Sequence, residues 1–463
     1  MSYKSSTFVQ CLNRGRNHLG WFYGFVLGLS LLTPNPGWAI HLQEHLDEWN
    51  ILRSHLDARG MSLETVNTTD IGSNVNRKRN HRALVIGDID LLLTLDTEKL
   101  FRWKGGTVFI YGLGLYGGTI SEGRDAQGIS NISGRNIWKL YEAWYQQNLF
   151  QEKLSILAGL YDVSSEFDVI SASSELFVNS SFGTNPTFAF GGENGPSIFP
   201  NVSLGFRAQA KLTEDLTLRA VVADGVPGDP PDDPNTMSLK LSQKDGILFA
   251  TEVAYYVGKP DLQQTDRQEV GAERPRRLVF RRLGRAAAIQ YDGKFALGGW
   301  FYTTDLDDLS KRDSAGNPVE RNGTYGIYGL AEQLVYGEPG PGEQGLWLFG
   351  QAAYANPKVN RFSHYFGGGL VYRGLIPGRD FDETGFGFAL ARNSSHYKDG
   401  QRQKGKRVAD QEVVLELTHA IHLSPAFTIQ PDVQYIIHPG TDPTRNNALA
   451  LILRLELMLN WFK

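Results

Sequence analysis

Leucine recurs at every second position along the stretch 448–461, which ends in a tryptophan. Leucine occupies every odd position from Leu449 to Leu459, whereas the even positions include Arg454 and Glu456. Since successive side chains of a strand point to opposite faces, this stretch is expected to be a strand with one apolar face and one face that carries charge. About 9–11 tilted residues suffice to cross a bilayer, so the strand is long enough to face lipid along its leucine side.

The same alternation recurs along most of the chain. The segment 206–212 alternates without a break, and 216–222 follows it after a short turn, as in a tight hairpin. This rhythm, interrupted by turn residues, predicts an all-β fold, a transmembrane barrel of about 16 antiparallel strands. The expected strands are 61–68, 83–96, 105–116, 136–148, 153–162, 203–212, 215–224, 246–257, 294–304, 325–336, 345–355, 362–373, 382–392, 412–420, 427–437 and 448–461.

Long and short connections alternate between these strands, as they do in outer-membrane barrels. The segment 258–293 is the exception, because it is long and rich in arginine but falls among the short turns. It is either an insertion on the periplasmic side or a sign that the strand count has slipped by one hairpin, and the insertion is the favoured interpretation. The long connections on the other side are 69–82, 117–135, 163–202, 225–245, 305–324 and 393–411.

The first part of the chain is organised like a secretory signal peptide. A basic beginning precedes an apolar run and a small-residue site ending at Ala39, which predicts a signal peptide over 1–39 that is cleaved. An uncleaved anchor helix is the alternative, and the shortness of the apolar run disfavours it. Apolar residues at helical spacing predict a short N-terminal helix over 40–60, and the barrel is expected over 61–463.

The composition agrees with a barrel and disfavours several kinds of binding site. Hydrophobic residues make up 41% of the chain and the mean hydropathy is -0.30, as expected where only alternate residues meet lipid. Without Lys4, Arg14 and Arg16 of the signal segment, 43 of the 46 basic residues remain against 50 acidic ones, which disfavours nucleic-acid binding. Cys11, the only cysteine, lies in that segment, so neither a disulfide scaffold nor a cysteine metal site is expected.

Five segments, taken in order, resemble those of one family. They are Leu140-Tyr-Glu-Ala-Trp144, Leu154-Ser-Ile-Leu-Ala-Gly-Leu-Tyr-Asp162, Ser165-Glu-Phe-Asp-Val169, Leu176-Phe-Val-Asn-Ser-Ser-Phe-Gly183 and Ile429-Gln-Pro-Asp-Val-Gln-Tyr-Ile-Ile-His-Pro-Gly440. The set is similar to the OprB-type carbohydrate-selective porins, and the resemblance covers nearly the whole chain after the signal segment. It implies a sixteen-stranded barrel in the Gram-negative outer membrane that passes small sugars by facilitated diffusion. It leaves open whether the barrel forms a homotrimer.

The segment 163–202 is expected to fold into the barrel as a constriction loop. Its length far exceeds that of ordinary loops, and it holds six phenylalanines. A pore selects by the groups at its narrowest point, where carboxylates and amides can hydrogen-bond to sugar hydroxyls. The alternative is that the phenylalanines only attach the loop to the barrel wall. The candidates in this loop are Glu166, Asp168, Glu175, Phe177 and Asn179.

Further candidates lie on the wall. Arg207 and Gln209 occupy the polar phase of one strand, and Arg219 lies on its hairpin neighbour. A charge that faces lipid near the midplane would cost about 2–4 kcal/mol, so these side chains are expected to face the lumen.

The strand 136–148 carries two more candidates, Glu142 and Trp144, which are expected to share a phase with Trp138. Trp144 either stacks on a sugar ring in the lumen or belongs to a lipid-facing aromatic girdle.

No motif in the sequence points to catalysis. The glycine-rich runs lie within expected strands, the histidines lack the spacing of a zinc site, and no serine stands in a nucleophile elbow. No cofactor is expected. The sequence therefore predicts a passive, sugar-preferring porin in contact with outer-membrane lipids. A general, weakly selective porin is one alternative, and a plugged barrel with an enzymatic or surface-binding role is the other.

Overall fold

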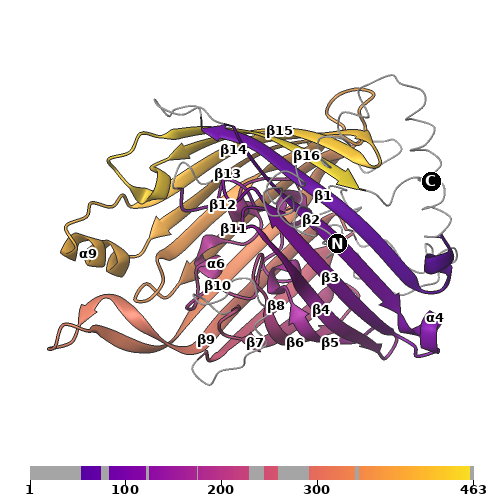
Figure 1. Cartoon of the computed structure of the whole chain (residues 1–463), viewed down its shortest axis with the longest axis horizontal. Coiled ribbons are helices and arrows are strands. Elements are labelled where there is room, and N and C mark those ends of the chain that lie inside the picture. Colours follow the sequence, from indigo (N-terminus) through magenta and orange to yellow (C-terminus); the bar gives the residue numbers. More distant parts are fainter. Residues whose placement is uncertain are drawn as a thin grey trace, which may run out of the picture. The chain divides into compact units, whose positions relative to one another are not determined.

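The computed structural model describes residues 54–74, 83–120, 125–174, 176–228, 245–258, 291–338 and 344–458. The chain divides into two compact units, and the unit 59–461 holds a closed barrel of sixteen antiparallel strands (Figure 1). The described part of the other unit, residues 54–58, is helical. The strands are β1 (Met61–Asn74), β2 (Leu84–Asp96), β3 (Gly106–Tyr116), β4 (Ile137–Leu149), β5 (Leu154–Tyr161), β6 (Ser203–Lys211), β7 (Leu216–Asp224), β8 (Ile247–Val257), β9 (Gly293–Arg312), β10 (Pro318–Gly337), β11 (Gly345–Ala355), β12 (Phe362–Arg373), β13 (Glu383–Asn393), β14 (Gln411–Ser424), β15 (Phe427–Ile437) and β16 (Ala448–Met458).

Short helices occupy some of the connections between the strands. Asp96 caps the first of them by accepting hydrogen bonds from the backbone N–H groups of Glu98 and Lys99. The α-helices are α4 (Thr97–Phe101), α5 (Ser171–Ser174), α6 (Pro186–Ala189) and α9 (Ser395–Gln403), and the 3-10 helices are η2 (Val163–Ser165), η3 (Ser180–Phe182) and η4 (Pro439–Thr441).

The barrel closes where β16 pairs with β1, with Arg454 opposite Asp70. Closure leaves no unpaired sheet edge, which a structure surrounded by lipid requires. On β16, Leu451 and Leu453 are 43% and 38% exposed, whereas Ile452 and Arg454 are buried. The alternation in the sequence is thus confirmed as an apolar outward face and an inward face that carries charge.

All sixteen expected strands are present, but the connection 305–324 is not a loop. β9 and β10 continue through it as a hairpin, with Asp305 opposite Asn322, and Asn322 donates a hydrogen bond of 2.7 Å to Asp305. The turn forms around Asp313, whose carboxylate accepts the backbone N–H groups of Ala315 and Asn317. The polar composition of the segment suggested a loop, because a hairpin beyond the bilayer needs no apolar face.

The phase of β4 changes at a bulge. Tyr111 of β3 lies opposite Glu142, but the next residue of β3 lies opposite Leu140, so Tyr141 is an extra residue. The prediction that Trp138 shares the inward phase is therefore wrong, because it lies beyond the bulge and is 64% exposed. Its ring covers Gly114 on the outward face, where a Cβ would come within 2.6 Å of the indole.

Three predicted segments lie partly or wholly outside the described residues. These are the signal peptide 1–39, most of the helix 40–60, and residues 259–290 of the arginine-rich segment 258–293. On either side of that last segment, β8 and β9 pair directly, with Val257 opposite Gly293. The strand count therefore does not slip there, and the periplasmic insertion stays a prediction.

Candidate functional site

The loop 163–202 leaves β5 and folds tightly from its first residues. Asp162 begins η2 by accepting hydrogen bonds from the backbone N–H and the hydroxyl of Ser164, at 2.8 and 2.6 Å. Asn185 begins α6 in the same way, through the N–H groups of Thr187 and Phe188. Aspartate and asparagine at such positions satisfy N–H groups that a helix leaves free, so this sequence folds compactly rather than as an extended loop.

Phenylalanines attach the loop to the wall. Phe177 and Phe182 stack on one another at 4.4 Å and lie over Gly385 and Gly387 of β13. A Cβ at Gly387 would come within 2.7 Å of Phe182, so the two glycines provide the space for the rings. Phe188 stacks on Trp300 of β9 at 5.5 Å. These contacts correspond to the alternative in which the aromatic rings hold the loop in place.

Three wall glutamates hold the backbone of the loop. Glu252 of β8 accepts the N–H of Asp168 at 3.0 Å. Glu332 of β10 accepts the N–H groups of residues 171 and 172, and Glu416 of β14 accepts those of residues 178 and 179. These three residues were not among the candidates predicted from the sequence. They could have been suspected from the sequence, because each is a glutamate on the inward face of its strand. Glu252, for example, lies between the small inward residues Ala250 and Ala254.

A second connection, 117–136, packs against the first. The N–H of Asn131 donates to the carbonyl of Val178 at 2.8 Å, and the N–H of Ser180 donates to the carbonyl of Gly128 at 2.9 Å. A fourth wall glutamate, Glu412 of β14, accepts the N–H groups of residues 126 and 127. The two connections therefore form one hydrogen-bonded layer attached to the inner wall.

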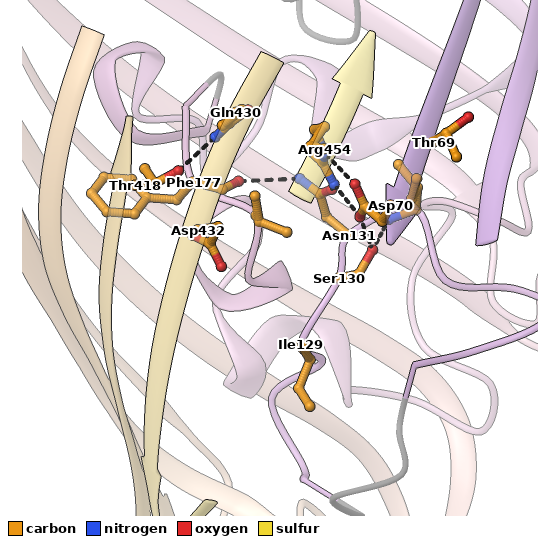
Figure 2. A network of polar contacts seen from close by, with 12 residues as sticks. Thr69, Asp70, Ile129, Ser130, Asn131, Phe177, Thr418, Gln430, Asp432 and Arg454 are labelled. Atoms are coloured by element: carbon orange, nitrogen blue, oxygen red, sulfur yellow. Dashed lines mark hydrogen bonds and ion pairs between the residues drawn. The ribbon is translucent and has the colours of Figure 1, made fainter. Parts of the chain in front are cut away.

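The layer also reaches the seam where the barrel closes. Figure 2 shows Arg454 of β16 bound to Asp70 of β1 through two hydrogen bonds of 2.8 Å. Asp70 accepts the hydroxyl of Ser130 at 2.7 Å, and Arg454 donates to Asn131 at 2.7 Å. The side-chain amide of Asn131 in turn donates to the carbonyl of Phe177, so the seam and both connections are joined.

Arg207 of β6 lies on the inner wall, as predicted, and is almost fully covered. Its guanidinium forms an ion pair of 2.8 Å with Glu166 and donates to Ser155 and to the amide of Gln146 at 2.9 Å. Tyr161 also donates to Glu166, at 2.6 Å. Burial raises the pKa of Glu166, but the charges of Arg207 and Arg219 outweigh it, and the resulting pKa lies below the usual value.

Arg219 of β7 also faces inward and is buried. It donates to Gln209 at 2.6 Å, to Glu252 at 3.1 Å and to the hydroxyl of Tyr256 at 2.9 Å. Because Glu252 accepts the N–H of Asp168, Arg219 supports the loop through one intermediate side chain.

Asp168 lies inside the loop with no exposed surface and a left-handed backbone, with φ 61°. It accepts two hydrogen bonds from Asn185, at 2.8 and 2.7 Å, and another from Gln351 of β11. Burial raises its pKa to about 7, and the nearby charge of Glu252 adds to the shift.

The remaining candidates lie in different surroundings. Asn179 begins η3 and donates to Gln434 of β15 at 3.1 Å. Trp144 faces inward, so it is not a girdle residue; it stacks on Phe109 at 4.9 Å and donates to Glu142. Glu175 lies outside the described residues.

Partly exposed polar side chains remain beside Arg207. Glu166 keeps 16% of its side-chain surface, and Gln209 and Gln146 are half-buried. The structure thus brings Arg207, Glu166 and Gln209 into one region of the wall, whereas Asp168, Phe177 and Asn179 are enclosed within the loop layer.

No group of three or more histidine, cysteine, aspartate or glutamate side chains among the described residues is arranged to hold a metal ion. No helix among them has the length and apolar character needed to cross a membrane.

Comparisons with known proteins agree with this architecture. The family model described as carbohydrate-selective porin, OprB family, matches residues 80–458. Porin B of Pseudomonas aeruginosa is 21% identical over 455 residues, which cover 92% of each chain. The putative porin QuiX of Acinetobacter baylyi is 20% identical, over 91% of this chain and 94% of its own. A solved structure, OprB of Pseudomonas putida at high pH, matches with a TM-score of 0.73 at 20% identity, covering 89% of this chain and 97% of that one.

Proposed function

The chain belongs to the OprB family of carbohydrate-selective porins, and we propose that the loop 163–202 forms the constriction through which its sugars pass. The protein is a sugar-selective porin of the Gram-negative outer membrane. The observation that carries the proposal is the attachment of this loop, at residues 168, 171, 172, 178 and 179, to glutamates of β8, β10 and β14. A loop held on so many strands narrows the barrel at a fixed place.

The proposed sugar contacts are Glu166, Arg207, Gln209 and Gln146. A sugar hydroxyl both donates and accepts. Here the Glu166 carboxylate, the Arg207 guanidinium and the Gln146 amide are joined by hydrogen bonds, and the Gln209 amide follows Arg207 on the same face of β6. Arg207 and Glu166 are already satisfied by each other, so a passing sugar would gain little from displacing them. Weak binding of this kind suits a pore, because a tight site would slow transport.

The proposed role of the other predicted residues is positioning. Arg219, Asp168 and Asn179 are buried and fully engaged in holding the loop, and Phe177 packs it on β13. Trp144 and Glu142 are bound to each other below the bulge of β4. We therefore propose that these residues set the width of the passage without touching sugar.

Membership of a porin family supports a channel, and we propose that the protein has no enzymatic role and works passively, driven by the concentration gradient. Liposome swelling tests this. Faster swelling with sugars than with amino acids of similar size is expected, and equal rates would favour a general porin. Single-channel conductance in a planar bilayer is a second test. The absence of a steady current would show that the barrel is plugged and would refute the passive-channel proposal.

We also propose that copies of the chain associate, as a homotrimer or a smaller oligomer, through the outer face of β1–β3. Tyr116 of β3 accepts a hydrogen bond of 3.0 Å from Asn67 of β1 and lies 2.6 Å from Thr69 on the same face. Polar outward residues are costly in lipid, and a second copy would cover them. The mass of the protein in mild detergent tests this, and a monomer at all concentrations would refute it.

Elsewhere, outer-membrane lipids are the expected neighbours of the outward face.

A further inference from the structure

A row of polar and aromatic side chains crosses the outward face of four strands at the end of the barrel that carries the long connections. His364 of β12 lies opposite Tyr354 of β11 and also opposite Arg392 of β13. Arg392 in turn lies opposite Gln411 of β14. The rings of Tyr354 and His364 meet edge to face at 5.2 Å. These four residues form one continuous row, called here the outer row.

The outer row lies directly beyond an apolar band. Along β13 the outward positions Phe386 and Phe388 are exposed, Leu390 follows, and Arg392 is exposed after them. On β12, Phe366 is the outward residue next to His364, and it lies on the side of the apolar band. An outward band of this kind ends where the lipid headgroups begin, so Arg392 stands at headgroup height.

The connection 394–410, which follows β13, adds positive charge at the same place. It carries five basic residues against two acidic ones and includes α9, seen beyond the ends of β13 and β14 in Figure 1. Lys398 forms an ion pair of 2.5 Å with Asp410. That contact, and the nearby charges of Arg392 and Arg402, hold the pKa of Asp410 below its usual value, so three basic groups surround one carboxylate.

Several of these charges are not neutralised by the protein. Arg402 forms an exposed pair of 3.0 Å with Asp399. Among the residues that the structure describes, no partner forms an ion pair with Arg392, Lys404, Lys406 or Arg407, and all four are exposed. An excess of unpaired cations beside a lipid boundary is the arrangement that binds anionic headgroups.

We propose that the outer row and the connection 394–410 bind the phosphate groups of the outer-leaflet glycolipid, with Arg392 as the central contact. The guanidinium offers two parallel donors that match a phosphate, and tyrosine is enriched at membrane interfaces. The outer row points away from the lumen, so its side chains meet lipid and not a transported sugar. The proposal depends on the outer-membrane location and not on the proposed sugar contacts.

The test uses the full-length protein in detergent micelles and two lipids, diphosphoryl lipid A and a dephosphorylated form with the same acyl chains. Wild type is expected to bind the diphosphoryl form about tenfold more tightly, as measured by native mass spectrometry. The double variant Arg392→Gln/Arg402→Gln should lose most of that preference. Equal binding of both lipids by wild type, or an unchanged preference in the double variant, overturns the proposal.

A matched control lies at the opposite end of the barrel. Lys99 and Arg102 are exposed at α4, between β2 and β3, and Lys99→Gln/Arg102→Gln removes the same charge there. This control should keep the wild-type preference, and an equal loss would show that net charge alone attracts the lipid, against the proposal. Sugar flux measured on the same preparations should not change in any variant, so the lipid site and the sugar path are tested separately.

Discussion

Arg207 on β6 and Glu166 on the loop 163–202 are joined by an ion pair of 2.8 Å, in which the arginine is 2% exposed and the glutamate 16%. The pair links a wall strand to the loop at the only cluster where predicted wall and loop candidates meet within the described residues. Removing one partner would leave the other charge poorly solvated, which usually costs more than the pair itself contributes.

The variant Arg207→Ala is expected to lower the free energy of unfolding by about 3 kcal/mol and to loosen the loop near Glu166. In planar bilayers its single-channel conductance should rise, and block of the current by added sugars should weaken. Lys211→Ala serves as the control, because its pair with Glu152 is long, at 3.8 Å, and partly exposed. Unchanged conductance and unchanged sugar block in Arg207→Ala would remove the loop contact from the proposed constriction.

Glu332 offers a test of the backbone attachments. Its carboxylate accepts the N–H groups of Ser171 and Ala172 and the hydroxyl of Tyr291. Glu332→Ala leaves these donors without an acceptor. Each donor that stays buried lowers the free energy of unfolding by about 1–3 kcal/mol. Hydrogen exchange at residues 171 and 172 should become faster by at least a factor of about ten. Glu332→Gln keeps one acceptor oxygen and should show an intermediate rate; if both variants exchange like wild type, the carboxylate does not hold the loop.

Gly387 tests the packing of the loop on β13. A methyl group there would come within 2.7 Å of Phe182, so Gly387→Ala is expected to destabilise the protein by about 1–3 kcal/mol and to increase current noise as the loop shifts. Gly350→Ala on β11 is the matched control, since the nearest atom to its added Cβ is 4.0 Å away. Equal melting temperatures for the two variants would contradict this account.

Asp168 predicts a pH dependence of stability. Its pKa is raised from 3.8 to about 7 in the folded protein, so the folded state holds a proton that the unfolded state has released. The free energy of unfolding should therefore fall as pH rises from about 4 to about 7, by at most about 1.4 kcal/mol per pH unit from this group. Above that window its contribution no longer changes.

The variant Asp168→Asn cannot titrate and should flatten the pH dependence in that window. Urea unfolding in detergent at several pH values provides the measurement, with the variant compared at each pH to wild type. A slope identical to that of wild type would show that Asp168 is already ionised throughout the window.

The strands were predictable because lipid imposes a simple rule on alternate side chains. Leu451 and Leu453 must face outward and Arg454 inward, and the rule needs no knowledge of the neighbouring strands. The rule gave a wrong result at the β-bulge in β4. The extra residue Tyr141 reverses the phase and turns Trp138 outward, and nothing in the sequence of β4 alone marks that bulge.

The site was less predictable, because its contacts join distant parts of the chain. Inward placement of Arg207 and Arg219 follows from alternation, but their partners do not. Glu252 and Glu416 accept backbone N–H groups, which carry no side-chain signature in the loop sequence. The acceptor can be suspected from a lone inward glutamate, but its donor is visible only in the folded structure.

The wall glutamates also impose an order on assembly. Glu252, Glu332 and Glu416 follow their loop partners by 84, 160 and 238 residues along the chain. Contacts between such distant positions form late, since the intervening polypeptide must be arranged first. The loop is therefore fully held only after strands made long after it have joined the wall, and β14 with Glu416 is the last of the three.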